Sequence, residues 1–176
     1  GRPFPDASTA EESDVILVNA EDDPSDTTRP RLEAAGADLS RVHVLSEVFS
    51  EDEEGARRMR AFTLEDVDAA EDALDAIESQ GRHAGAIILD PVSAFMTGID
   101  SHKNTDVRSA LRPWSDLASR RDVAVVCVSH LNKGGAGSAA IYRITGSLAF
   151  AAAARAVWAV VRDPEDDSRR LLLPVK

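Results

Sequence analysis

Short apolar runs rich in Val, Ile and Leu are spaced along the chain, with polar or helical segments between them. Five of these runs have the length of a β-strand, which predicts strands over 14–20, 41–45, 86–90, 123–129 and 157–161. The runs over 86–90 and 123–129 are apolar at successive positions, as in strands that are covered on both faces of a parallel sheet. We therefore expect these two strands to be buried.

Helical periodicity marks the segments between the runs. Pro24 begins a helix that Gly36 ends, and apolar residues recur every three or four positions in 64–80 with acidic residues opposite. A further amphipathic helix carries Val107, Leu111, Trp114 and Leu117, and the Ala-rich segment 147–155 is also helical. Strands that alternate with helices predict an α/β fold with a mainly parallel sheet, in which ligands bind at the carboxyl ends of the strands.

Three other segments complete the pattern. Residues 171–175 follow a turn and are expected to pair with 157–161 as a C-terminal antiparallel hairpin. Residues 50–60, an acidic cluster followed by a basic one, are predicted to form a solvated loop. Cys127 lies inside an apolar run and is predicted to be a small core residue, and as the single cysteine it excludes a disulfide framework.

The length of 176 residues is typical of one domain, and no apolar run approaches the roughly 20 residues that a membrane-spanning helix needs. These features and the lone cysteine favour a reducing cytoplasm. The net charge of −11 is unevenly distributed, because residues 1–90 carry 23 acids against 8 Lys and Arg, whereas residues 91–176 carry 8 against 12. Any contact with nucleic acid is therefore expected from loops of the second half.

Polar side chains follow three of the predicted strands and make them candidates for chemistry. Asp90 ends the run AIILD, Glu21 and Asp22 follow the run VILVN, and His130 follows VAVVCVS. Because the carboxyl ends of parallel strands meet at one edge, Glu21, Asp90 and His130 are expected to lie together. Each also has a simpler interpretation, since Asp90 before a proline suits a turn, Glu21 suits a solvated strand end, and His130 could cap a loop.

The segments VILVNAEDD, AIILDPVSAF, VCVSHLNKG and YRITGSLAF, in this order and ending in RDPEDDSRRLLLPVK, resemble the RecA-like ATPases of the RepA type. These are the ATPase domains of plasmid and phage replicative helicases and their bacterial relatives. The resemblance extends from Asp14 over nearly the whole chain. It implies a RecA-like P-loop NTPase core, ATP and Mg²⁺ as ligands, a hexameric ring, and single-stranded DNA in the central channel.

The resemblance also implies roles for individual residues. Asp90 matches the Walker B aspartate that holds magnesium through water, and Glu21 matches the catalytic glutamate that polarises the attacking water. Asp22 would support Glu21 or the metal, and Ser129 with His130 would form the polar sensor of the γ-phosphate. Lys133 matches a loop that faces the channel, and Lys103 is a second candidate for contact with DNA. Arg143, Arg155 and Arg162 could reach a neighbouring subunit's phosphate, but none is singled out as an arginine finger.

One family motif has no counterpart in the sequence. A glycine-rich phosphate loop that ends in Gly-Lys-Ser or Gly-Lys-Thr should precede the strand before Glu21, and no such segment is present. We therefore expect residues 1–176 to be one partial RecA-like domain that lacks the first strand, the phosphate loop and its helix. Such a fragment would bind nucleotide poorly on its own. The alternative is a non-catalytic RecA-like scaffold that binds a protein partner.

Overall fold

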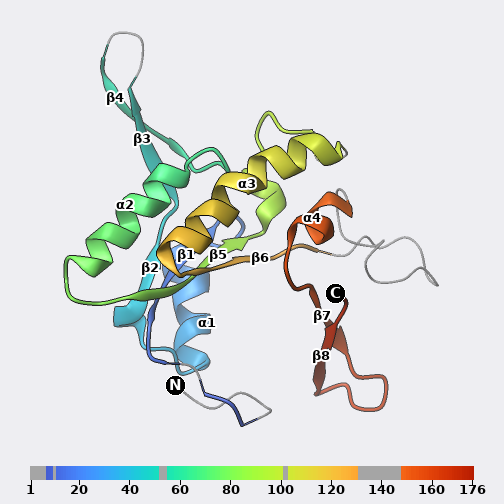
Figure 1. The fold of residues 1–176 in the computed structure, drawn as a ribbon. Coiled ribbons are helices and arrows are strands. Elements are labelled where there is room, and N and C mark those ends of the chain that lie inside the picture. The colour runs from blue at the N-terminus through green and yellow to red at the C-terminus, as the bar shows by residue number, and fades with distance from the viewer. Residues whose placement is uncertain (1–6, 10, 52–54, 101–102, 131–147) are drawn as a thin grey trace.

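A four-stranded parallel sheet forms the centre of the fold (Figure 1). This computed structural model describes residues 7–9, 11–51, 55–100, 103–130 and 148–176. The strand order is β2-β1-β5-β6, and every neighbouring pair is parallel, which confirms the predicted α/β architecture. The four strands are β1 (Asp14–Asn19), β2 (Val42–Val44), β5 (Ala84–Asp90) and β6 (Ala124–Cys127).

Helices connect the strands and cover the sheet. The helices α2 (Val67–Glu78) and α3 (Asn104–Arg121) contact each other and pack on one face of the sheet. Figure 1 shows α1 (Arg29–Ala34) on the other side of the strands, where it continues the π-helical turn η1 (Pro24–Thr28). The remaining elements are the 3₁₀ turns η2 (Leu39–Arg41) and η3 (Val92–Phe95) and the helix α4 (Leu148–Ala153), which packs against α3.

The core lies between the sheet and the pair α2 and α3. Alternate residues of β1 and β5 point to this side, and the periodic apolar residues of both helices meet them, as the sequence predicts. Trp114 is 1% exposed, and its indole N–H donates a 2.9 Å hydrogen bond to the carbonyl of Leu64. Phe62 packs edge-on against Phe95, with ring centroids 5.7 Å apart. These contacts join the segment between β4 and α2 to α3 and to the segment that follows β5.

The opposite face of the sheet is only partly covered by the described residues. Leu17, Ile88 and Val126 pair in register across three strands; Leu17 and Ile88 are partly buried, and Val126 is 45% exposed. Strand β6 pairs only with β5 among the described strands, so the prediction that residues 123–129 form a buried strand is wrong for most of it. Cys127 is likewise exposed at this edge, not a core residue.

Two antiparallel hairpins extend from the central sheet (Figure 1). At the C-terminus, β7 (Trp158–Arg162) pairs with β8 (Arg170–Pro174), which confirms the predicted hairpin. The strands β3 (Glu47–Glu51) and β4 (Arg57–Ala61) form a projecting arm, so the prediction of a solvated loop over 50–60 is wrong for residues 50–51 and 57–60. Of the charges that suggested a loop, Glu51, Arg57, Arg58 and Arg60 lie on the paired strands, and Asp52, Glu53 and Glu54 lie outside the described residues.

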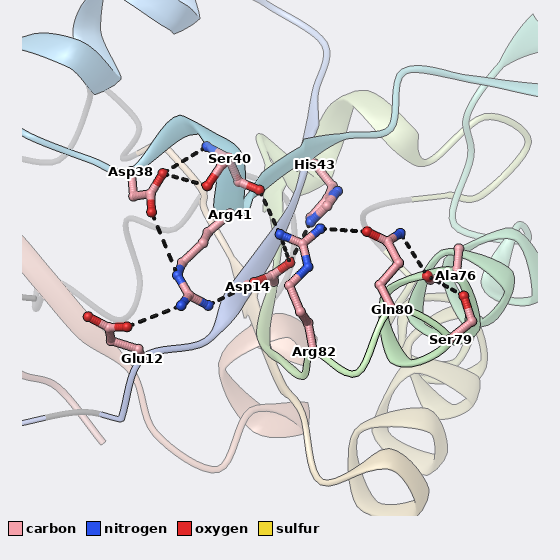
Figure 2. Close-up of polar contacts among 10 residues, drawn as sticks. All are labelled: Glu12, Asp14, Asp38, Ser40, Arg41, His43, Ala76, Ser79, Gln80 and Arg82. Carbon is pink, nitrogen blue, oxygen red and sulfur yellow. Dashed lines mark hydrogen bonds and ion pairs between the residues drawn. The ribbon is translucent and has the colours of Figure 1, made fainter.

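A cluster of charged side chains lies at the amino end of the sheet, around Asp14 (Figure 2). Asp14 is fully buried at the start of β1, and its carboxylate lies 2.7 Å from His43 Nε2, 3.2 Å from Arg41 Nη1 and 3.3 Å from Arg82 Nη1. Arg82 also donates to the carbonyl of Ser40 at 2.9 Å. These contacts connect the beginnings of β1 and β2 to the segment that leads into β5.

Candidate functional site

The carboxyl ends of β1, β5 and β6 meet at one edge of the sheet. Asn19, the last residue of β1, pairs in register with Asp90, the last residue of β5. The N–H of Ala20 donates a 3.2 Å bond to the carbonyl of Asp90, and the N–H of Val128 donates a 2.9 Å bond to the carbonyl of Leu89. These bonds keep neighbouring chain segments in register just beyond the strand ends. They place the segments that bear Glu21 and His130 on either side of Asp90.

Asp90 is held firmly by its surroundings. Strand β5 is flanked by β1 and β6, and the chain after Asp90 turns into η3, whose Val92 and Phe95 are 1% and 4% exposed. The N–H of Val92 also donates a 2.9 Å bond to the carbonyl of Val128, which ties η3 to the end of β6. A carboxylate in this position cannot move far from the strand end.

The carboxylate of Asp90 is poorly compensated within the described structure. Partial burial raises its pKa, the charges of Glu21 and Asp22 raise it further, and only His130 acts in the opposite direction. No hydrogen bond or ion pair to the Asp90 side chain is found among the described residues. A carboxylate that is destabilised in this way gains from a bound cation.

Glu21 and His130 face each other across this edge. His130 Nε2 lies 3.4 Å from Glu21 Oε2, and the two side chains are 64% and 57% exposed. Neither side chain is packed into the core, so both are open to a ligand from solvent. A carboxylate of this kind can accept a hydrogen bond from water, and an imidazole can donate one to an anionic oxygen.

The three acids that follow β1 have different surroundings. The Asp22 carboxylate pairs with the guanidinium of Arg31 on α1. Asp23 caps η1, where its Oδ1 accepts a 2.8 Å bond from the N–H of Ser25 and a 3.1 Å bond from the N–H of Asp26. The hydrogen bonds from Ser25 and Asp26 lower the pKa of Asp23. Glu21 is therefore the acid of the three that turns toward His130.

The remaining predicted site residues differ in how the structure places them. The Ser129 hydroxyl is buried beside His130 in sequence, and it has no hydrogen-bond partner among the described residues. An unpaired buried hydroxyl at the edge that carries Asp90 suits a site that binds a polar ligand. Lys103 is exposed immediately before α3. Lys133, and Arg143 among the arginines, lie outside the described residues.

Sequence reasoning missed two side chains that shape this edge. Asn19 Oδ1 accepts bonds from the N–H groups of Glu21 at 2.8 Å and Asp22 at 3.0 Å. Arg31, an apparently ordinary basic residue on a short helix, neutralises Asp22. An Asn two residues before a polar position is a known signal for such a turn, so Asn19 could have been found from sequence, whereas the pairing of Arg31 needs the fold.

The acidic and histidine side chains of the described residues limit how a metal ion could bind. No group of three or more His, Cys, Asp and Glu side chains is arranged to hold a metal ion within the part of the chain that the structure describes. A metal at Asp90 would therefore need water or ligand oxygens to complete its shell, as Mg²⁺ commonly does in nucleotide sites. No helix in the described ranges is long and apolar enough to cross a membrane.

A parallel α/β sheet with carboxylates and a polar sensor-like pair at its carboxyl edge has the architecture of a P-loop ATPase core. A comparison with protein families agrees, since the family described as an AAA domain matches residues 1–136. The chain belongs to this family of AAA-type P-loop ATPases. A comparison with curated proteins gave no match.

Proposed function

We propose that the intact protein hydrolyses ATP as a RepA-like ATPase, either a replicative DNA helicase or a DNA-remodelling enzyme. The observation that carries the proposal is the common edge of Glu21, Asp90 and His130. Among the described residues, the Asp90 carboxylate has no hydrogen bond or ion pair there, and the Ser129 hydroxyl has no hydrogen-bond partner. Membership of the AAA domain family supports nucleotide binding in general. The resemblance of the motifs to RepA-type ATPases supports the narrower activity.

Each residue has a role that its position allows. Asp90 would hold the waters of a magnesium ion, and the bound ion would neutralise charge on the phosphates. Glu21 would accept a hydrogen bond from the attacking water and orient it toward the γ-phosphate. His130 and Ser129 would donate hydrogen bonds to phosphate oxygens, and the release of His130 after hydrolysis would report the loss of the γ-phosphate. Asp22 is held by Arg31 and would support Glu21 without contacting the phosphates.

No glycine-rich Gly-Lys-Ser or Gly-Lys-Thr segment lies within the sequence printed here, so the proposed activity requires a phosphate-binding loop from another part of the intact protein. We propose that a further strand, with this loop at its end, pairs with the open side of β6. Support comes from the composition of β6, which is apolar on both faces as in an interior strand, although Val126 is 45% exposed. A helix after the loop would then cover the row of Leu17, Ile88 and Val126.

The proposed partners follow from the same resemblance. A hexameric ring would place each ATP site between subunits, and single-stranded DNA would pass along the channel near Lys103 and Lys133 in the cytoplasm. The excess of basic residues in the second half of the chain is compatible with this contact. The acidic total means that DNA affinity should be modest and strongly dependent on salt.

Steady-state ATP hydrolysis by the intact protein, as its full gene encodes it, tests the activity. We expect Glu21→Gln to lower kcat by about 100-fold or more while nucleotide binding persists, since the change removes the acceptor for the attacking water. Glu12→Gln is the matched control, because Glu12 pairs with Arg41 at the other end of the sheet and should leave kcat unchanged. An intact protein that neither binds nor hydrolyses ATP would refute the proposal and favour the scaffold alternative.

The same assay separates a DNA motor from another ATPase. Single-stranded DNA should stimulate hydrolysis at low salt, and Lys103→Ala together with Lys133→Ala should weaken DNA binding and flatten its salt dependence. Stimulation that is absent at every salt concentration, with ATP hydrolysis intact, would retain the ATPase and reject the helicase.

A further inference from the structure

The backbone that carries Glu21 is fixed by a single side chain. Asn19 Oδ1 accepts two hydrogen bonds, at 2.8 Å from the N–H of Glu21 and at 3.0 Å from the N–H of Asp22. This arrangement turns the chain sharply as it leaves β1, and it satisfies two N–H groups that have passed beyond the strand ladder. The turn decides the direction in which the Glu21 side chain points.

The Glu21 side chain has little else to hold it. It is 57% exposed, and its described polar contact is His130, 3.4 Å away and itself 64% exposed. Asp22, the other residue of the turn, is held from outside by Arg31 on α1. The position of the Glu21 carboxylate therefore depends on the backbone, and the backbone depends on Asn19 and, through Asp22, on α1.

We propose that Asn19 is a positioning residue for hydrolysis, which acts by fixing the turn that aims Glu21. This inference rests on the proposed ATPase activity. Asn19 lies in register beside Asp90 on the neighbouring strand, so the turn also sets the separation between Glu21 and Asp90. Small errors in the placement of a group that orients a nucleophile are costly, about 100-fold in rate for a displacement of about 1 Å.

The choice of an amide at position 19 has a physical reason. Asp can form the same turn as Asn, because both offer an acceptor oxygen two residues before the donor. An Asp here would add a further carboxylate beside Glu21, Asp22 and Asp90, and the charges of Glu21 and Asp22 already raise the pKa of Asp90. Asn supplies the acceptor without more negative charge.

Three variants of the intact protein test this role. Asn19→Ala removes the acceptor, and Asn19→Asp keeps it. Asp38→Ala is the matched control, because Asp38 Oδ1 accepts a 3.0 Å bond from the N–H of Ser40 in a similar turn at the opposite edge of the sheet (Figure 2). The measurements are kcat and KM for ATP, and the exchange rates of the Glu21 and Asp22 amides by NMR.

We expect Asn19→Ala to lower kcat by about 10- to 100-fold with KM for ATP within about threefold, because orientation is lost and binding is not. The Glu21 and Asp22 amides should exchange faster, by about tenfold, while amides of β1 stay protected. Asn19→Asp should restore the protection and bring kcat to within about fivefold of wild type. Asp38→Ala should leave kcat unchanged.

Two results would overturn the inference. Faster exchange in Asn19→Ala with unchanged kcat would mean that the turn does not position Glu21 for the reaction. An Asn19→Asp variant as slow as Asn19→Ala, with its amides protected, would show that a restored turn does not restore the rate, which contradicts a role of Asn19 through the turn. If wild type itself does not hydrolyse ATP, the proposed function fails, and the exchange rates still decide whether Asn19 fixes the turn.

Discussion

Asp14 and Asp90 are the same chemical group at opposite ends of neighbouring strands, in opposite surroundings. Burial alone would raise the pKa of Asp14, but the hydrogen bond from His43 and the charge of Arg82 outweigh it, so its pKa is lowered. Burial raises the pKa of Asp90, and the charges of Glu21 and Asp22 add to this effect. The charge of Asp14 is compensated by His43 and Arg82. The charge of Asp90 is not compensated in this way among the described residues, so a bound cation would stabilise it.

Replacement of each aspartate by asparagine should therefore change stability in opposite directions at pH 7, in the absence of nucleotide and Mg²⁺. Asp14→Asn leaves Arg41 and Arg82 without their buried partner and should cost about 3 kcal/mol, at the low end for a buried pair because both arginines are about one-third exposed. Asp90→Asn removes a destabilised charge and should raise Tm. Urea unfolding and thermal melting measure the two effects.

The pH dependence of the free energy of unfolding tests whether Asp14 stabilises the fold and Asp90 destabilises it. The stabilisation from Asp14 is present above its unfolded pKa of 3.8 and is lost as the pH falls through its lower folded pKa. The destabilisation from Asp90 is present above its raised folded pKa and disappears as the pH falls toward 3.8. Both variants should thus approach wild type in strong acid. A less stable Asp90→Asn variant at pH 7 would show that Asp90 is already compensated.

The helices and strands differ in how much of their apolar surface is buried in the core, and the β3–β4 arm shows this difference most clearly. Strand β4 ends at Ala61, and the next residue, Phe62, is 3% exposed and packs against Phe95 and Trp114. Phe49, on the arm itself, is 65% exposed and pairs across the strands with Met59. The arm is therefore anchored at its base, while Phe49 and Met59 add little to the core.

Replacement by alanine should lower the free energy of unfolding much more at Phe62, at the base of the arm, than at Phe49 on the arm itself. Phe62→Ala should cost about 3–5 kcal/mol of unfolding free energy, because a large cavity opens between Phe95 and Trp114. Phe49→Ala should cost less than about 1 kcal/mol, since it loses only exposed contacts and the stacking of Arg57 on its ring. Equal losses in urea unfolding would mean that the arm is packed against another part of the protein.

The arm also explains where the sequence pattern failed at the level of elements. Of the two strands only Val48 is buried in the core, so neither strand shows a clear alternation of apolar and polar residues. Charged residues that normally indicate a loop are paired across the strands, as Glu51 and Arg57 are. By contrast, β1, β5, α2 and α3 carry strong periodicity or continuous apolar runs, and all four were predictable.

At the scale of the whole molecule, the sequence predicted the α/β fold and the C-terminal hairpin, because both follow from local patterns and general rules of connection. It did not predict that β6 would have a single neighbour among the described strands, since an apolar run gives no information on how many neighbours a strand has. The meeting of Glu21 with His130 was expected from the rule for parallel sheets. The turn at Asn19 was not predicted, although an Asn at this position could have indicated it, whereas the pair of Asp22 with Arg31 depends on the fold.

A structure of the intact protein with Mg²⁺ and a non-hydrolysable ATP analogue is the most decisive test of whether this edge of the sheet is a nucleotide site. We expect the terminal phosphate at the carboxyl ends of β1, β5 and β6, with Asp90 near the metal, Glu21 and His130 near the γ-phosphate, and an added strand beside β6. Nucleotide bound elsewhere, or a partner protein seated on this edge with no nucleotide, would contradict the assignment of Glu21, Asp90 and His130 to ATP hydrolysis.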